Sequence, residues 1–213
     1  MSESERAVGS FRERKKAETR ARIAAVATML FLERGFDQVT VAEVAEAAGC
    51  SAMTVFNYFP RKEDLFLDRI PEIVAMFEQA ALRRGPGVSA VSAVHTMLVQ
   101  QLEAGHPLVA LRDDLAHFWR VVLDSPSLRA RAREGVEEVE RALADAVAAG
   151  GDDPHPRLTA ALVVAAYRAV FVTAAGRMLA GEPAEAVAPR HRALMDGAFR
   201  VLETASSDLG QFE

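Results

Sequence analysis

Apolar residues recur along most of the chain at intervals of three and four residues, the spacing that is typical of amphipathic α-helices. The first such stretch covers residues 13–34 and ends at Gly35, a residue type that commonly terminates helices. Its apolar positions are Ile23, Val26, Ala27, Leu30 and Phe31. Apolar and polar residues nowhere alternate over more than a few positions, so the sequence does not favour β-strands. The pattern predicts an all-α protein of about nine helices.

Two short helices are expected next. Thr40 followed by Glu43 is a capping box, in which the hydroxyl accepts the Glu43 amide while the carboxylate reaches back, and it predicts a helix over residues 41–48. Ser51 can cap a further helix, which ends before Pro60 because proline disfavours helical backbone in the residue that precedes it. These signals predict two short helices joined by a tight turn.

The remaining helices are separated by segments rich in glycine and proline. A fourth helix is expected to start around Arg61 to Glu63 and to be kinked by Pro71 before it continues toward the "GPG" break at residues 85–87. Five more helical stretches are expected at about residues 88–104, 107–123, 126–149, 156–180 and 184–206.

The two short helices fit a helix-turn-helix. Such a motif needs a small residue where the helices cross, a glycine in the turn and a branched apolar residue on the second helix, and Ala45, Gly49 and Val55 supply them. If Val55 and Phe59 face the core, the rest of the second helix points elsewhere. It then presents hydroxyls, an amide and a small side chain, from Ser51, Ala52, Thr54, Asn57 and Tyr58. These groups suit DNA, since asparagine can pair with adenine and hydroxyls reach phosphates.

Charge is distributed unevenly along the chain. The net charge of −5 argues against a protein that coats nucleic acid through bulk positive charge. Residues 6–22, however, carry seven basic side chains against two acidic ones. Lys62 adds a positive charge beside the free N–H groups that start the next helix. One end of the molecule is therefore a candidate surface for binding a polyanion.

Several classes of function lack the residues that they need. The single cysteine, Cys50, excludes an internal disulfide and disfavours a thiolate metal site. The sequence contains no phosphate-binding glycine loop and no nucleophile elbow, so we expect neither catalysis nor a cofactor. No apolar run reaches the roughly 18 to 20 residues of a membrane span, and the N-terminus lacks the apolar region of a secretory signal. We therefore expect a cytoplasmic protein without a membrane partner.

The segment "GFDQVTVAEVAEAAGCSAMTVFNYFPRKEDLF", residues 35–66, closely resembles the DNA-binding signature of the TetR family of bacterial transcriptional regulators. The match runs from the basic first helix to Phe66 and keeps the order and spacing of the family's pattern. The remaining two thirds of the chain agree in length and helical content. The resemblance implies a DNA-binding N-terminal domain followed by a larger helical domain for ligand binding and dimerisation.

Nine residues are expected at the DNA interface: Arg14, Lys15, Thr40, Ser51, Ala52, Thr54, Asn57, Tyr58 and Lys62. The resemblance implies that Thr54, Asn57 and Tyr58 face the DNA and that Thr40 and Lys62 hold phosphates. Arg14 and Lys15 are expected to attract the DNA backbone without sequence preference. This sequence departs from the family at two positions, because the frequent tyrosine is Phe56 here and the frequent histidine is Tyr58. Tyr58 is expected to replace the missing hydroxyl.

Two apolar stripes near the C-terminus predict a homodimer. One is dominated by small side chains, at Leu158, Ala161, Leu162, Ala165, Ala169, Val172, Gly176 and Leu179. The other consists of Leu194, Ala198, Val201, Leu202 and Ala205. The helices near residues 156–180 and 184–206 can then build a four-helix interface across a twofold axis, which fits a near-palindromic operator in double-stranded DNA. A monomer that buries both stripes internally is the alternative.

The resemblance also implies that the protein is a repressor and that a small-molecule effector releases it from its operator. The candidate effector-binding residues are Met97, Arg112, His117, Phe118, Trp119, Tyr167 and Phe171. Core packing explains the apolar members of this set equally well.

A rival hypothesis is an all-helical metal-binding protein or hydrolase. It centres on Asp113, Asp114 and His117, because Asp113 and His117 have the spacing that places two ligands on one helix face. We expect a surface or ligand-facing role for these residues instead, since the sequence contains no second cluster of this kind.

The expected domain organisation has four parts. Residues 1–12 form a flexible basic arm, residues 13–60 the helix-turn-helix domain, residues 61–206 the ligand-binding and dimerisation domain, and residues 207–213 a tail.

Overall fold

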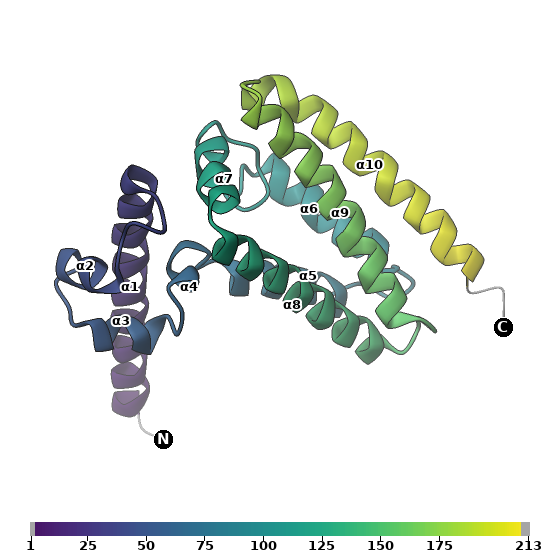
Figure 1. The fold of residues 1–213 in the computed structure, drawn as a ribbon. Coiled ribbons are helices and arrows are strands. Elements are labelled where there is room, and N and C mark those ends of the chain that lie inside the picture. Colours follow the sequence, from purple (N-terminus) through teal and green to yellow (C-terminus); the bar gives the residue numbers. More distant parts are fainter. Residues whose placement is uncertain (1–2, 210–213) are drawn as a thin grey trace. The chain divides into compact units, whose positions relative to one another are not determined.

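The computed structural model describes residues 3–209, with the side chains of residues 12–206. This part of the chain forms ten α-helices and no strand (Figure 1). They are α1 (Glu3–Arg34), α2 (Val41–Ala47), α3 (Ala52–Tyr58), α4 (Glu63–Phe66), α5 (Ile70–Leu82), α6 (Ala90–Glu103), α7 (Asp114–Asp124), α8 (Pro126–Gly150), α9 (Pro156–Leu179) and α10 (Ala184–Leu209).

The chain divides into two compact units. The N-terminal unit extends to Asp68 and also includes Val121–Arg131, which covers the end of α7 and the start of α8. The C-terminal unit comprises Arg69–Arg120 and the chain from Ala132 onward.

The predicted all-α fold is confirmed, with one helix more than the nine expected. The difference arises at Pro71, where a single kinked helix was predicted and the structure has two helices, α4 and α5. Leu67 leaves the helical conformation with φ −99° and ψ 38°, and Pro71 lies in the first turn of α5. Proline is tolerated there because the first amides of a helix have no intrahelical acceptor.

Two helix ends at the chain termini lie outside their predicted positions. The helix α1 begins at Glu3, so the segment expected as a flexible arm, residues 1–12, is helical from Glu3 onward. No proline interrupts this segment, and its charged residues are mostly good helix formers. At the other terminus α10 extends to Leu209, past the predicted end at residue 206. The last four residues of the predicted tail lie outside the described part of the chain.

The helix α7 begins at Asp114, later than the predicted residue 107. The His106 carbonyl accepts the amides of both Val109 and Ala110, at 3.0 and 2.8 Å, and this makes a turn in place of a continuing helix. Asp113, just before α7, accepts the Ala184 amide at 2.8 Å and so binds the start of α10. A contact between residues so far apart in the chain is not visible in a local sequence pattern.

The core of the N-terminal unit forms around Phe31 of α1, whose side chain is fully buried. The centroid of its ring lies 4.9 Å from that of Phe36, in the loop after α1, and 5.8 Å from that of Phe66 in α4. One side chain of α1 thus holds both the loop and α4. The unit consequently extends past the boundary expected after Pro60, because α4 packs on α1.

The core of the C-terminal unit is built from five helices. The most extensive helix–helix packing is between α9 and α10, which lie side by side (Figure 1). Leu98 of α6, Leu143 of α8 and Met195 of α10 are fully buried in the same cluster as Phe77 of α5 and Val163 of α9. This cluster fixes the positions of α5 and α9.

Polar contacts join α6 to α10 along one seam. His95 Nε2 lies 2.8 Å from Asp196 Oδ1, and the Ser89 hydroxyl donates to the Glu203 carboxylate at 2.7 Å. A groove of about 370 Å³ runs beside these pairs. Sequence reasoning missed this seam because its partners are far apart in the chain.

The helix α9 is long and apolar enough to cross a membrane by length and composition alone, with a mean hydropathy of 1.8. Core helices of globular proteins meet the same two conditions. Here Val163, Val170, Ala174 and Met178 of α9 are buried against the rest of the C-terminal unit, so the apolar character of α9 is used for packing.

His191 of α10 is 2% exposed, and neither ring nitrogen has a well-formed hydrogen bond within the described part of the chain. Burial lowers the pKa of His191, and the nearby Val170 backbone offsets part of this effect. Because the unfolded chain then binds a proton more readily, the free energy of unfolding is expected to decrease as the pH falls below about 6.5.

Replacement of His191 by leucine should remove this contribution. Urea unfolding at pH 7.5 and pH 5.5, values on either side of the ordinary pKa near 6.5, is expected to show a smaller loss of stability for the variant than for the wild type. The matched His155→Leu variant, at an exposed histidine, should follow the wild type. Parallel curves for His191→Leu and wild type would contradict the assignment.

Candidate DNA interface

The turn between α2 and α3 has the geometry of a helix-turn-helix. Gly49 has a φ of +65°, a conformation that residues with a Cβ rarely adopt, and the Cys50 amide donates to the Ala45 carbonyl at 2.9 Å. Ala45 and Val55 are buried, as the motif requires. The predicted pairing of the two short helices is confirmed, and α3 is held by Val55 and Phe59.

The predicted capping box at the start of α2 is present. The Thr40 hydroxyl accepts the Glu43 amide at 3.2 Å, and the Thr40 amide donates to the Glu43 carboxylate at 2.8 Å. Arg34 of α1 donates to the same carboxylate at 2.6 Å. The hydrogen bonds from Thr40 and Arg34 lower the pKa of Glu43 to about 2. Thr40, the predicted phosphate contact, therefore lies at a fixed and exposed helix start.

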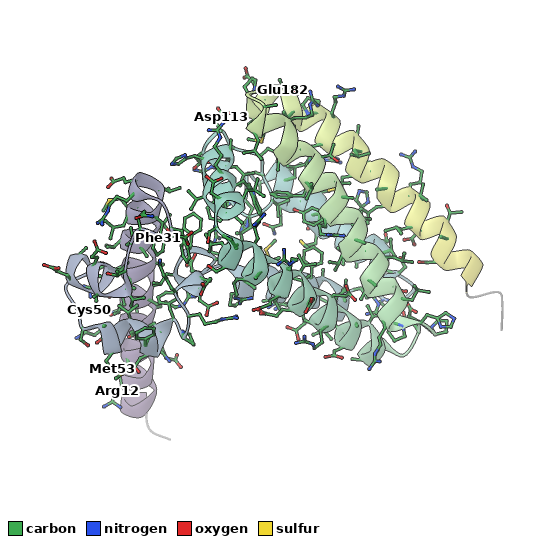
Figure 2. All side chains as sticks on the ribbon, in the orientation of Figure 1. Arg12, Phe31, Cys50, Met53, Asp113 and Glu182 are labelled. Carbon is green, nitrogen blue, oxygen red and sulfur yellow. The ribbon has the colours of Figure 1, made fainter. Side chains whose placement is uncertain are left out.

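The outward face of α3 is formed by Met53, Phe56 and Asn57, all exposed. Met53 is 70% exposed and Phe56 46%, and Figure 2 shows Met53 on the outer side of α3. The residues are separated by three and four positions, so they share one helix face. Sequence reasoning missed Met53, although an apolar residue among the polar positions of this helix was a usable signal.

The other predicted residues at α3 cap the helix or are half-buried. Ser51 caps the helix by accepting the Thr54 amide at 3.1 Å, and the two hydroxyl oxygens lie 2.9 Å apart. Ala52 and Tyr58 are half-buried at the sides of the helix. Asn57 is thus the predicted α3 residue that combines an exposed position with a side chain able to read a base edge.

The first helix contributes positive charge in the same unit. Arg12, Arg14, Lys15 and Lys16 are exposed on α1, and the Arg14 Nε lies 3.8 Å from the Glu18 carboxylate. Figure 2 shows Arg12 toward the N-terminal end of α1. An exposed basic segment of this kind attracts the DNA backbone without reading its sequence.

Lys62 has an internal contact that the sequence did not predict. Its ammonium donates to the Phe36 carbonyl at 2.6 Å and lies 4.2 Å from the centroid of the Phe36 ring. Desolvation lowers the pKa of Lys62. The side chain ties α4 to the loop before α2, and only its remaining two N–H groups can contact a phosphate.

Four of the predicted effector-binding residues come together in the C-terminal unit. Phe118 and Trp119 of α7 adjoin each other, and Trp119 contacts Phe171 of α9, which adjoins Tyr167. Phe77 of α5 extends this chain of rings, although no local sequence pattern indicated it. The predicted residue Met97 packs against the core cluster.

The remaining candidates in this unit point elsewhere. Arg112 and His117 are exposed, and Arg112 donates to Asp114 at 2.7 Å. Asp113 lies near Glu182 at the start of α10 in Figure 2, where it accepts the Ala184 amide. No group of three or more potential metal ligands occurs among residues 12–206. The metal-binding or hydrolytic alternative is not favoured, because both aspartates are used by donors of the chain itself.

A capped helix-turn-helix with an exposed recognition face, an adjoining basic helix and a larger helical unit define a transcriptional regulator that binds DNA. Residues 23–68 match the family model described as "Bacterial regulatory proteins, tetR family", and residues 89–207 match the model described as "MftR C-terminal domain". The protein belongs to the TetR family of bacterial transcriptional regulators.

Individual relatives agree with this assignment. The chain is 31% identical to the HTH-type transcriptional regulator TcmR of Streptomyces glaucescens over an alignment of 169 residues. This alignment covers 75% of this chain and 72% of TcmR. A putative TetR-family regulator from Mesorhizobium loti superimposes with a TM-score of 0.54 at 19% identity, over 87% of this chain and 96% of that one. FadR of Thermus thermophilus, solved with lauroyl-CoA, gives 0.53 at 21% identity, over 86% and 92%. These two structures support the fold.

Proposed function

We propose that the protein is a repressor that binds a near-palindromic operator as a homodimer and is released by a small-molecule effector. The observation that carries the proposal is the outward face of α3, on which Asn57 lies beside the exposed side chains of Met53 and Phe56 while Val55 and Phe59 hold the helix in place. The protein would act in the cytoplasm, because its family consists of soluble DNA-binding regulators.

The homodimer is supported by the outer surface of α9 and α10. Leu158 and Val172 on α9 and Leu194 and Val201 on α10 are 43, 60, 46 and 68% exposed. Small residues between them on α9, such as Ala169, are also exposed. In a monomer these apolar side chains would remain in water, whereas a second copy can cover them. Two recognition helices about 34 to 36 Å apart would then face successive major grooves.

An effector is supported by the fold and by the ring cluster of the C-terminal unit. Among proteins of the same fold, FadR was solved with lauroyl-CoA and SmeT with triclosan. A molecule that favours one conformation of this unit would shift the population away from the DNA-binding state. Those two ligands do not indicate which molecule this protein binds, because the sequence identities are only 21 and 16%.

The first test is a selection of random double-stranded DNA by the purified protein. We expect an enriched sequence with twofold symmetry, whose half-sites are one helical turn apart, because a dimer presents the same helix twice. The selection is run at two salt concentrations, since phosphate contacts from α1 weaken steeply as salt rises. A library that remains random at low salt would refute the proposal, and an asymmetric site would refute the dimer.

A further inference from the structure

Four buried side-chain polar atoms of the C-terminal unit have no hydrogen-bond partner among the residues that the structure describes. Two are the ring nitrogens of His191, and the other two are the indole Nε1 of Trp119 and the hydroxyl oxygen of Tyr167. Folded proteins leave few such atoms, because a buried donor loses its bonds to water and gains nothing in return. Two of them in one region call for a physical explanation.

The atoms of Trp119 and Tyr167 belong to the same chain of aromatic rings. The Phe171 ring lies between them, with its centroid 5.7 Å from that of Trp119 and 6.3 Å from that of Tyr167. Trp119 is on α7, whereas Tyr167 and Phe171 are on α9. The two unpaired groups therefore belong to rings on two different helices, which are joined through Phe171.

Trp119, Tyr167 and Phe171 are each only partly buried as residues, while the two polar atoms are covered. A molecule can therefore pair with these atoms only if the side chains that cover them move apart. The closed arrangement is costly because it leaves two donors unpaired, and an inserted molecule that pairs them would stabilise the open one.

The two donors define what the inserted molecule must offer. An indole N–H can only donate. Burial raises the pKa of Tyr167, so its hydroxyl stays protonated and can donate as well. The cations nearest along α7 have other partners, since Arg112 binds Asp114 and Arg120 lies near the Leu179 carbonyl. The side chains that form the cluster are themselves uncharged, and they offer donors and ring faces.

We infer that this ring cluster is the effector site and that it takes an uncharged, flat, conjugated molecule with at least two hydrogen-bond acceptors, such as ring carbonyl oxygens. Insertion between α7 and α9 pairs Trp119 Nε1 and the Tyr167 hydroxyl with these acceptors, while Phe171 stacks on the conjugated plane. The inference rests on the proposed function in that it assigns a ligand class to the proposed effector.

Trp119 is the single tryptophan of the chain, so its fluorescence reports on this site alone. The full-length protein is titrated with 1,8-dihydroxyanthraquinone and with flavone, two neutral flat carbonyl compounds. At least one is expected to quench Trp119 saturably. Anthracene-9-carboxylate, which is flat but anionic, and laurate, which is an acyl chain, are expected to bind more weakly.

The Tyr167→Phe variant separates a specific site from nonspecific adsorption. It removes one donor, so affinity for the bound carbonyl compound is expected to fall about 5- to 10-fold. The unliganded variant should melt at the same or a higher temperature, because an unpaired hydroxyl has been removed. The matched Thr96→Val variant removes an exposed hydroxyl from α6 and should bind as the wild type does.

Three results would overturn the inference: no quenching by either carbonyl compound, preferred binding of laurate or of the anion, or an affinity that is insensitive to Tyr167→Phe. The failure of the proposed function looks different. If the compound binds as expected and the selected operator stays bound at saturation, the ligand class stands and release by an effector is wrong.

Discussion

Operator affinity is expected to fall by about two to four orders of magnitude when Asn57 is replaced by alanine. Asn57 is the exposed amide on α3, and one bidentate contact between an amide and adenine is worth about 1 to 3 kcal/mol. A dimer makes this contact once in each half-site, so the free-energy loss doubles. Fluorescence anisotropy with the selected operator measures the change.

The way in which operator affinity is lost distinguishes recognition of a base edge from electrostatic attraction to the DNA backbone. The variant should select a site with relaxed preference at one position of each half-site, while its salt dependence stays unchanged. The Lys15→Ala variant should do the opposite, with a uniform loss across sequences and a shallower salt slope. The Gln100→Ala variant removes an exposed amide from α6 and should bind normally. Unchanged affinity and site preference for Asn57→Ala would place base recognition elsewhere on α3.

The local elements of the DNA-binding unit could be predicted because they depend on nearby residues. The capping box of Thr40 and Glu43 spans three positions, and the turn at Gly49 depends on the backbone freedom of a single residue. Val55 and Phe59 are four positions apart, so the buried face of α3 followed from helical spacing. The positions of α2 and α3 were therefore visible in the sequence.

Contacts between distant segments were not predictable in this way. The tie from Lys62 to the Phe36 carbonyl and the use of Asp113 to bind the start of α10 depend on how the chain folds back. The metal-binding alternative arose for this reason, because the spacing of Asp113 and His117 says nothing of their partners, and it is not favoured. Likewise, the four aromatic residues were named as possible lining of an apolar cavity, and only the structure joins them through Phe171.

The largest stability effect is expected from Arg131, a 7% exposed arginine in the first turns of α8. Its Nε donates to the Asp64 carboxylate of α4 at 2.7 Å, within the N-terminal unit. Replacement of Arg131 by methionine keeps much of the apolar stem and removes the charge, which leaves Asp64 poorly solvated. Arg61, 3.5 Å from Asp64, provides partial compensation. We expect a loss of about 3 kcal/mol in the free energy of unfolding, at the low end for a broken buried ion pair.

Urea unfolding of three variants tests this origin of the loss. Arg133→Met, at an exposed arginine two positions further along α8, should change stability by less than about 0.5 kcal/mol. The double variant Arg131→Met with Asp64→Asn should recover much of the loss, because the stranded carboxylate is neutralised. If the double variant is less stable than Arg131→Met alone, the loss comes from packing around the arginine stem and not from the unpaired charge.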